Sequence, residues 1–182
     1  MRVISGKAKG RQLKVPKGNI RPLTSQAKEA LFNIFAAKTP ECDFLDLFAG
    51  SGAVGIEALS RGARIAFFVE IDRKSIPVIW ENLKLCGFAD NAEVYSLPVN
   101  RALIIFNKKG VKFDIIFAGA PYGFKGLEET LIYLGEYSLL KDSGVIIAEH
   151  RHKQDLAEEF GKLKKIRSER YGDTVFSFYK EQ

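Results

Sequence analysis

The chain has 182 residues, of which 46% are hydrophobic, so it is long enough for one domain with a sizeable core and too apolar to be disordered. It holds no apolar run of about 20 residues, which argues against a membrane span. Its N-terminal residues lack the apolar segment of a signal peptide, which argues against secretion through such a peptide. Cys42 and Cys86 lie far apart without metal-ligand spacing, so we expect a cytoplasmic protein with two ordinary thiols and no metal site.

Positive charge is concentrated at the N-terminal end of the chain. The whole chain has a net charge of +6. Residues 1–40 hold nine Lys or Arg and one acid, Glu29, which gives this segment +8 and leaves −2 for the other 142 residues. A solvated basic face would explain a scattered excess, but clustered cations displace counterions from phosphates and so favour contact with a polyanion. The candidate contacts are Arg2, Lys7, Lys9, Arg11 and Arg21.

The first predicted elements belong to this basic segment. Residues 2–5 and 11–15 are expected to form two short strands around the turn GKAKG, which makes a small hairpin. Residues 24–37 place apolar side chains at helical spacing. We expect this hairpin and helix, residues 1–40, to be an extension of the domain at residues 41–182 and part of the same unit.

From residue 43 onward, strands alternate with helices. The predicted strands are 43–48, 64–72, 92–96, 113–119 and 144–150. The predicted helices are 54–62, 74–87 and 126–137. The tail, 164–181, predicts two strands joined near residues 171–173. This alternation predicts an α/β fold with a mostly parallel, seven-stranded sheet, helices on both faces and a last strand that inserts antiparallel.

A glycine-rich turn follows the first strand of this series. Gly50 and Gly52 allow a tight turn and close approach of a ligand, and the helix after them directs its N–H groups into the same crevice. Gly55 stands where a dinucleotide fingerprint would have its third glycine, so the glycine spacing alone is ambiguous.

Two acids favour one kind of ligand at this turn. Asp46, before the glycines, would repel a phosphate but suits a cationic amine or sulfonium, and Glu70, at the end of the next strand, can accept ribose hydroxyls. The pattern therefore indicates S-adenosylmethionine (SAM) rather than NAD. A turn that only packs a helix on a strand is the alternative.

The strand at 113–119 ends in Gly119-Ala120-Pro121-Tyr122. A strand that ends in Asp-Pro-Pro-Tyr or Asn-Pro-Pro-Tyr is typical of enzymes that methylate the amino nitrogen of a base. Here the acid or amide is missing, while the proline and the aromatic residue remain.

These segments together resemble those of a known family, the RsmD-type 16S ribosomal RNA guanine-N2 methyltransferases. MRVISGKAKGRQLKVP, RPLTSQAKEALFNIF, DLFAGSGAVGIEALSRGA, VEID and APY occur in the same order, so the resemblance covers nearly the whole chain. It implies a Rossmann-like class I SAM-dependent methyltransferase with an RNA-binding extension, acting on small-subunit rRNA or an assembled particle. We expect a monomer. The implied cofactor residues are Asp46, Phe48, Ala49, Gly50, Ser51, Gly52, Glu70 and Ile71, with Asn100 or Arg101 near the adenine.

Gly119 departs from the family pattern and leaves the base amine without a side-chain acceptor. The backbone carbonyls of Gly119 and Ala120, the rigid Pro121 and the stacking ring of Tyr122 remain as catalytic candidates. Glu149 ends the neighbouring strand and could supply the missing acceptor, with His150 positioning the base or a phosphate; alternatively, Glu149 forms an ion pair on the RNA-binding face. Two further functions stay open: methylation of a DNA adenine or cytosine, and a catalytically weak, SAM-binding RNA-binding protein.

Overall fold

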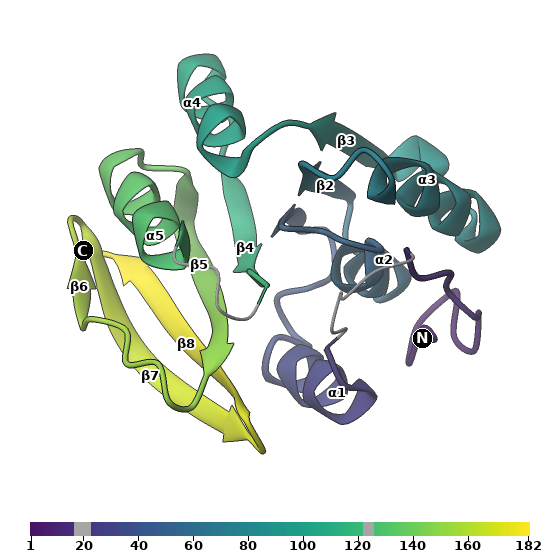
Figure 1. The fold of residues 1–182 in the computed structure, drawn as a ribbon, viewed down its shortest axis with the longest axis horizontal. Helices are drawn as coiled ribbons and strands as arrows, with labels where there is room; N and C mark the ends of the chain where they lie inside the picture. Colours follow the sequence, from purple (N-terminus) through teal and green to yellow (C-terminus); the bar gives the residue numbers. More distant parts are fainter. Residues whose placement is uncertain (17–22, 122–125) are drawn as a thin grey trace.

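A single mixed sheet organises the molecule (Figure 1). The computed structural model describes residues 1–16, 23–121 and 126–182. Its sheet has the strand order β3-β2-β1-β4-β5-β8-β7-β6, with parallel pairing from β3 to β5 and antiparallel pairing from β5 to β6. The strands are β1 (Asp43–Leu47), β2 (Ile65–Glu70), β3 (Ala92–Ser96), β4 (Phe113–Ala118), β5 (Leu140–Arg151), β6 (Glu159–Phe160), β7 (Leu163–Tyr171) and β8 (Thr174–Glu181).

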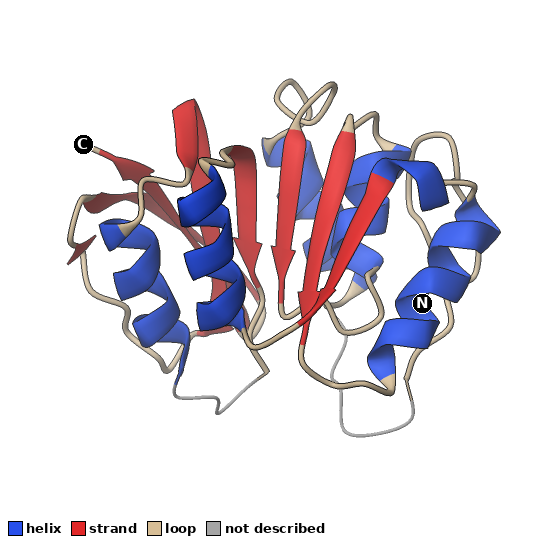
Figure 2. Ribbon diagram, turned by 90° about the horizontal axis from the view of Figure 1, so that it is seen from above, coloured by secondary structure: helices blue, strands red, loops and turns tan. Residues whose placement is uncertain are grey.

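Helices cover both faces of this sheet (Figure 2). The helices are α1 (Ser25–Ile34), α2 (Ala53–Ser60), α3 (Ser75–Cys86), α4 (Val99–Lys109) and α5 (Gly126–Glu136), with a short 3-10 helix η1 (Ala89–Asn91). The residues of α1, α2 and α3 pack into one hydrophobic core and those of α4 and α5 into a second. Within the part of the chain that the structure describes, no helix is both long enough and apolar enough to cross a bilayer.

The two cores follow from the alternation of side chains along the central strands. In β1, Phe44 enters the core under α1 to α3, whereas Leu45 and Leu47 enter the core under α4 and α5. All five residues of β1 are buried, as expected for a central strand covered on both faces. A charged side chain on such a strand is buried away from water, so the presence of Asp46 in β1 needs a specific explanation.

The predicted α/β architecture is confirmed, including the antiparallel insertion of the last strand between β5 and β7. The expected count of seven strands is wrong, because the sheet has an eighth strand, β6, which pairs with β7. A strand of two residues is too short to show an alternating pattern in the sequence. The helix α4 was not predicted; it begins directly after Pro98 and ends at Lys109, with Gly110 as its C-cap.

The N-terminal segment forms a hairpin that is less regular than expected. Instead of two strands, a single bridge pairs Arg2 with Gln12, and the backbone N–H of Val3 donates to the carbonyl of Arg11 at 3.0 Å. Val3, Ala8 and Leu13 are buried against the domain. The hairpin is therefore held by its apolar residues, which leaves its basic side chains on the outside.

Glu57 of α2 fastens this hairpin to the domain. Its carboxylate, which is fully buried, accepts hydrogen bonds from the backbone N–H groups of Ile4 at 2.9 Å and Ser5 at 3.0 Å. The same carboxylate lies 2.9 Å from both Lys28 Nζ and Arg61 Nε. Burial lowers the pKa of Lys28, and the charge of Glu57 opposes that effect. A buried charge is costly unless it is paired, so this cluster ties the hairpin, α1 and α2 together.

Candidate active site

A cavity of about 780 Å³ opens at the carboxyl ends of the parallel strands. This edge is where ligands bind in open α/β sheets, and the volume is within the range of roughly 300–1,000 Å³ found for small-molecule sites. The predicted site residues that line the cavity are Asp46, Phe48, Ala49, Gly50, Ser51, Glu70, Ile71, Asn100, Gly119, Ala120, Pro121 and Glu149. The structure thus brings together residues that are up to 103 positions apart in the sequence, from Asp46 to Glu149.

The glycine-rich turn between β1 and α2 has a backbone that favours glycine. Gly50 has a φ of 58° and Gly52, the N-cap of α2, a φ of 76°. Phe48 also has a positive φ, 64°, although it carries a side chain, which marks this turn as strained. Gly52 caps the helix and does not line the cavity, so its part in the turn is conformational.

Glu70 is held in a fixed orientation at the end of β2. Its Oε2 accepts from Gly50 N–H at 2.7 Å, and its Oε1 accepts from Asp72 N–H at 2.8 Å. Each carboxylate oxygen has a second lone pair, so both can still accept from a ligand that enters the cavity. The carboxylate therefore joins the glycine-rich turn to β2 and presents two acceptors side by side.

Asp46 lies at the floor of the cavity with 1% of its surface exposed. Its Oδ2 accepts a hydrogen bond from Gly55 N–H at 2.9 Å, which places the carboxylate at the first turn of α2. Burial raises the pKa of Asp46 to about 7, the hydrogen bond from Gly55 opposes the rise, and the charges of Glu70 and Glu149 add to it. A cation in the cavity would relieve this accumulation of negative charge.

The structure distinguishes Asn100 from Arg101, the two residues predicted to lie near an adenine. Asn100 and Arg101 both lie in the first turn of α4. Asn100 lines the cavity, and its Oδ1 accepts from Arg101 N–H at 2.8 Å. The Arg101 side chain is exposed and outside the lining, so Asn100 is the better placed of the two.

Gly119 and Glu149 lie beside each other where β4 and β5 end. The two strands are in parallel register, with Ala118 opposite Ala148, so Gly119 and Glu149 occupy the next position. A Cβ atom built on Gly119 would be 3.2 Å from Glu149 Oε2 and 2.5 Å from Cε1 of the Phe117 ring. Glu149 is 9% exposed.

His150 faces away from the cavity, which corrects the expectation that it positions the base or a phosphate. Adjacent residues of a strand point to opposite faces. The His150 ring is buried, and its Nε2 lies 2.9 Å from Ser177 Oγ on β8. Burial lowers the pKa of His150, which favours a neutral ring in this structural role. Tyr122 and Arg21 lie outside the described residues.

Two walls of the cavity were missed by the sequence reading. One wall is formed by Met1 and Val15 at the hairpin, Leu23 just before α1 and Lys28 of α1. The other is formed by Gly126, Glu129, Thr130 and Tyr133 of α5. No local motif marks these residues, because only the fold brings them to the cavity. The basic candidates Arg2, Lys7, Lys9 and Arg11 are exposed on the hairpin next to the first wall and do not line the cavity.

Comparison with known proteins assigns relatives to this chain. The profile of the family described as "Conserved hypothetical protein 95" matches residues 1–180. The chain is 42% identical to the "Putative rRNA methyltransferase YlbH" of Bacillus subtilis (strain 168) over all of both chains. It is 37% identical to the "Ribosomal RNA small subunit methyltransferase D" of Escherichia coli (strain K12), over 82% of this chain and 74% of that protein. The solved structure of the "Putative methyltransferase yhhF from Escherichia coli" superposes with a TM-score of 0.85 at 34% identity, covering 100% of this chain and 98% of that chain.

Proposed function

Because the chain belongs to the Conserved hypothetical protein 95 family of RsmD-like methyltransferases, we propose that it transfers a methyl group from SAM to the exocyclic N2 amine of a guanine in small-subunit rRNA. The single observation that carries this proposal is the shared cavity. The glycine-rich turn with its acids and the Gly119-Ala120-Pro121 corner line the same cavity, so a cofactor and a base would meet there.

The residues of the cavity fit SAM. Five acids line it, Asp46, Glu70, Asp72, Glu129 and Glu149, against two cations, Lys28 and Arg151. A sulfonium and an ammonium group suit such a set better than phosphates do. Glu70 would accept the ribose hydroxyls, the turn at residues 48–51 with Asp46 would hold the amino-acid end, and Ile71 with Asn100 would contact the adenine. Once bound, the sulfonium supplies the methyl group in an electrophilic form.

The other wall of the cavity would receive the base. An exocyclic amine is a weak nucleophile because its lone pair is delocalised into the ring. Hydrogen-bond acceptors on the two N–H groups direct that lone pair, and orientation of this kind can contribute roughly 7–11 kcal/mol to lowering the barrier. The backbone carbonyls of Gly119 and Ala120 are candidates for one acceptor. Pro121 limits the conformations of this corner.

The hairpin would supply the contact with RNA. Arg2, Lys7, Lys9 and Arg11 are exposed beside the wall that Met1 and Val15 contribute to the cavity. Phosphate contacts fix the position of a protein on nucleic acid, whereas contacts in the cavity would select the base. We propose that the protein acts as a cytoplasmic monomer on small-subunit rRNA or on the assembled particle.

The test is methylation of small-subunit particles and of naked 16S rRNA from a strain that lacks the corresponding methyltransferase. Labelled SAM and mass spectrometry of the nucleosides would identify N2-methylguanosine as the expected product, and calorimetry would measure SAM binding in parallel. SAM binding with methylation of adenine or cytosine in DNA would replace this proposal with the alternative substrate. A protein that binds neither SAM nor RNA would overturn it.

Gly119 favours a second candidate, a SAM-binding RNA-binding protein with weak catalysis. The lost acceptor is worth about 1.5–3 kcal/mol if nothing replaces it, which is roughly a 10- to 100-fold slower reaction. Single-turnover rates on the same particles separate the two candidates, because a protein with weak catalysis would bind SAM and RNA but methylate the particles only slowly even at enzyme excess.

A further inference from the structure

We propose that Glu149 accepts a hydrogen bond from the guanine N2 amine and so takes the place of the acidic side chain that Gly119 lacks. The inference rests on the proposed function and adds a catalytic residue to it. It is argued from the position of Glu149, from the space around Gly119 and from the chemistry of the amine.

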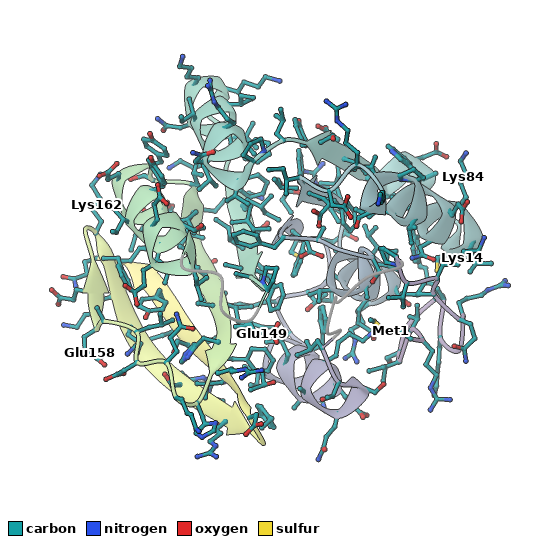
Figure 3. The ribbon with its side chains drawn as sticks, viewed as in Figure 1. Met1, Lys14, Lys84, Glu149, Glu158 and Lys162 are labelled. Carbon is teal, nitrogen blue, oxygen red and sulfur yellow. The ribbon has the colours of Figure 1, made fainter. Side chains whose placement is uncertain are left out.

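The strands place Glu149 on the correct face of the sheet. Phe117 of β4 and Ile147 of β5 both enter the core under α1 to α3, so Gly119 and Glu149, two residues further along, continue on that face. Asp46 stands opposite Phe117 in β1 and therefore shares the face. Figure 3 shows Glu149 in the middle of the molecule, between β5 and α1, where the cavity lies.

The space around Gly119 is already taken by two side chains. A Cβ atom there would lie 2.5 Å from Cε1 of Phe117, closer than non-bonded carbon atoms approach, and 3.1 Å from Cζ of the same ring. On its other side it would be 3.2 Å from Glu149 Oε2. An aspartate at position 119 would therefore require the Phe117 ring to move and would crowd the carboxylate of Glu149. The carboxylate of Glu149 therefore lies within 3.2 Å of the point where an aspartate side chain would begin.

The chemistry requires an acceptor at this point. The amine nitrogen uses its lone pair to form the new N–C bond while the C–S bond breaks and its electron pair stays on sulfur. The nitrogen then carries a positive charge and loses one of its two protons. A carboxylate that accepts from one N–H orients the lone pair beforehand, stabilises the developing charge and can receive that proton.

The test compares wild-type protein with Glu149→Gln, which keeps the size of the side chain and removes its charge. Single-turnover methylation would be measured at saturating SAM and small-subunit particles, normalised to the SAM-binding stoichiometry from calorimetry. The assay is run at pH 8.5, because the charge of Glu149 raises the pKa of Asp46 and both proteins should carry an ionised Asp46. Glu158→Gln is the matched control, since Glu158 is exposed at the far edge of the sheet (Figure 3).

We expect the Glu149→Gln rate constant to fall about 10- to 100-fold, as for loss of a hydrogen bond to a charged group, with the SAM dissociation constant within threefold of wild type. A wild-type rate in this variant would overturn the inference and leave the proposed function intact. A rate that falls only in proportion to the fraction of protein that binds SAM would overturn it as well, in favour of a structural role. Absence of methylation by the wild type would overturn the proposed function and the inference together.

A rescue variant adds a second test. Phe117→Leu removes the ring that excludes a side chain at position 119, so Gly119→Asp in that background can place a carboxylate next to position 149. We expect the triple variant with Glu149→Gln to recover at least tenfold in rate over Phe117→Leu with Glu149→Gln. No recovery, with SAM binding retained, would contradict the equivalence of the two carboxylates.

Discussion

Asp46 is a carboxylate whose charge the folded, ligand-free protein disfavours. Its pKa is raised from 3.8 to about 7, chiefly by burial, so the folded state binds this proton more tightly than the unfolded state does. The sign follows: between about pH 4 and pH 7, ionisation of Asp46 costs stability, and that cost grows as the pH rises. A bound cation reverses the preference, because it favours the ionised form.

This ionisation predicts proton release on binding of SAM. Near pH 7, part of the ligand-free protein has Asp46 protonated, and the cationic ligand would expel that proton. Calorimetry at pH 7 in two buffers with different ionisation enthalpies measures the number of protons released. We expect a positive release for the wild type that is smaller at pH 8.5. The Asp46→Asn variant supplies the baseline, and equal proton release in the two proteins would contradict the assignment.

At the level of single residues, the sequence predicts chemistry better than it predicts environment. Asp46, Glu70 and Glu149 are recognisable because they are acids at the ends of buried strands. The ring of Phe117 beside Gly119 could not be foreseen, because its position depends on the rotamer and on packing against a neighbouring strand. The orientation of His150 could have been foreseen, since adjacent strand residues alternate in direction.

At the level of elements, α3 connects the basic hairpin to the cofactor turn through one buried amide. Asn82 Oδ1 accepts from Lys14 N–H at 2.8 Å, and Asn82 Nδ2 donates to the carbonyls of Lys14 and Ser51, both at 2.9 Å. Asn82 is fully buried, and its hydrogen bond to Ser51 is buried as well, so water is no easy substitute for the amide at that carbonyl. The side chain of Asn82 therefore holds both the hairpin and the glycine-rich turn.

Replacing this anchor should loosen both elements together. We expect Asn82→Ala to lower the free energy of unfolding by about 1–3 kcal/mol, because buried backbone groups lose their partners. We also expect weaker SAM binding and faster hydrogen exchange in residues 1–16. Asn91→Ala, at an exposed amide of η1, is the control. Faster exchange in the hairpin without any loss of SAM affinity would contradict the link.

The elements that the sequence failed to predict share a physical cause. The helix α4 buries only Ala102, Leu103 and Phe106 and exposes its polar face, so its apolar signal is narrow. The hairpin at the N-terminus is fixed by contacts with Glu57, Ser60 and Asn82, which are more than 50 residues away, rather than by its own strand pairing. By contrast, the regular succession of apolar strand segments and helical segments along the chain was sufficient to predict the strands β1 to β5 and the closing hairpin.

On the scale of the whole molecule, charge and cavity lie next to each other. The exposed side chains of Arg2, Lys7, Lys9 and Arg11 project from a hairpin whose other residues form a cavity wall. Among the described residues, none of these four forms an ion pair. They are therefore available to neutralise phosphates close to a base in the cavity.

Their contribution should appear in the salt dependence of RNA binding. Each lost phosphate contact reduces the slope of log affinity against log salt by about 0.7–0.9. We expect Lys7→Gln with Lys9→Gln to reduce this slope by about 1.5 and to leave SAM affinity unchanged. Lys108→Gln with Lys109→Gln, at the end of α4 (Figure 1), is a charge-matched control. An equal change in both double variants would indicate a nonspecific effect of net charge.

The burial of Glu57, Ser60 and Asn82 under the hairpin has a consequence for the folding of the nascent chain. With residues 1–40 removed, a carboxylate, a hydroxyl and an amide would lose the backbone groups that satisfy them, and apolar surface around them would meet water. We therefore expect α2 and α3 to become stable in the nascent chain only after the N-terminal hairpin has packed against them. The segment that would touch RNA is then also the part that closes the fold.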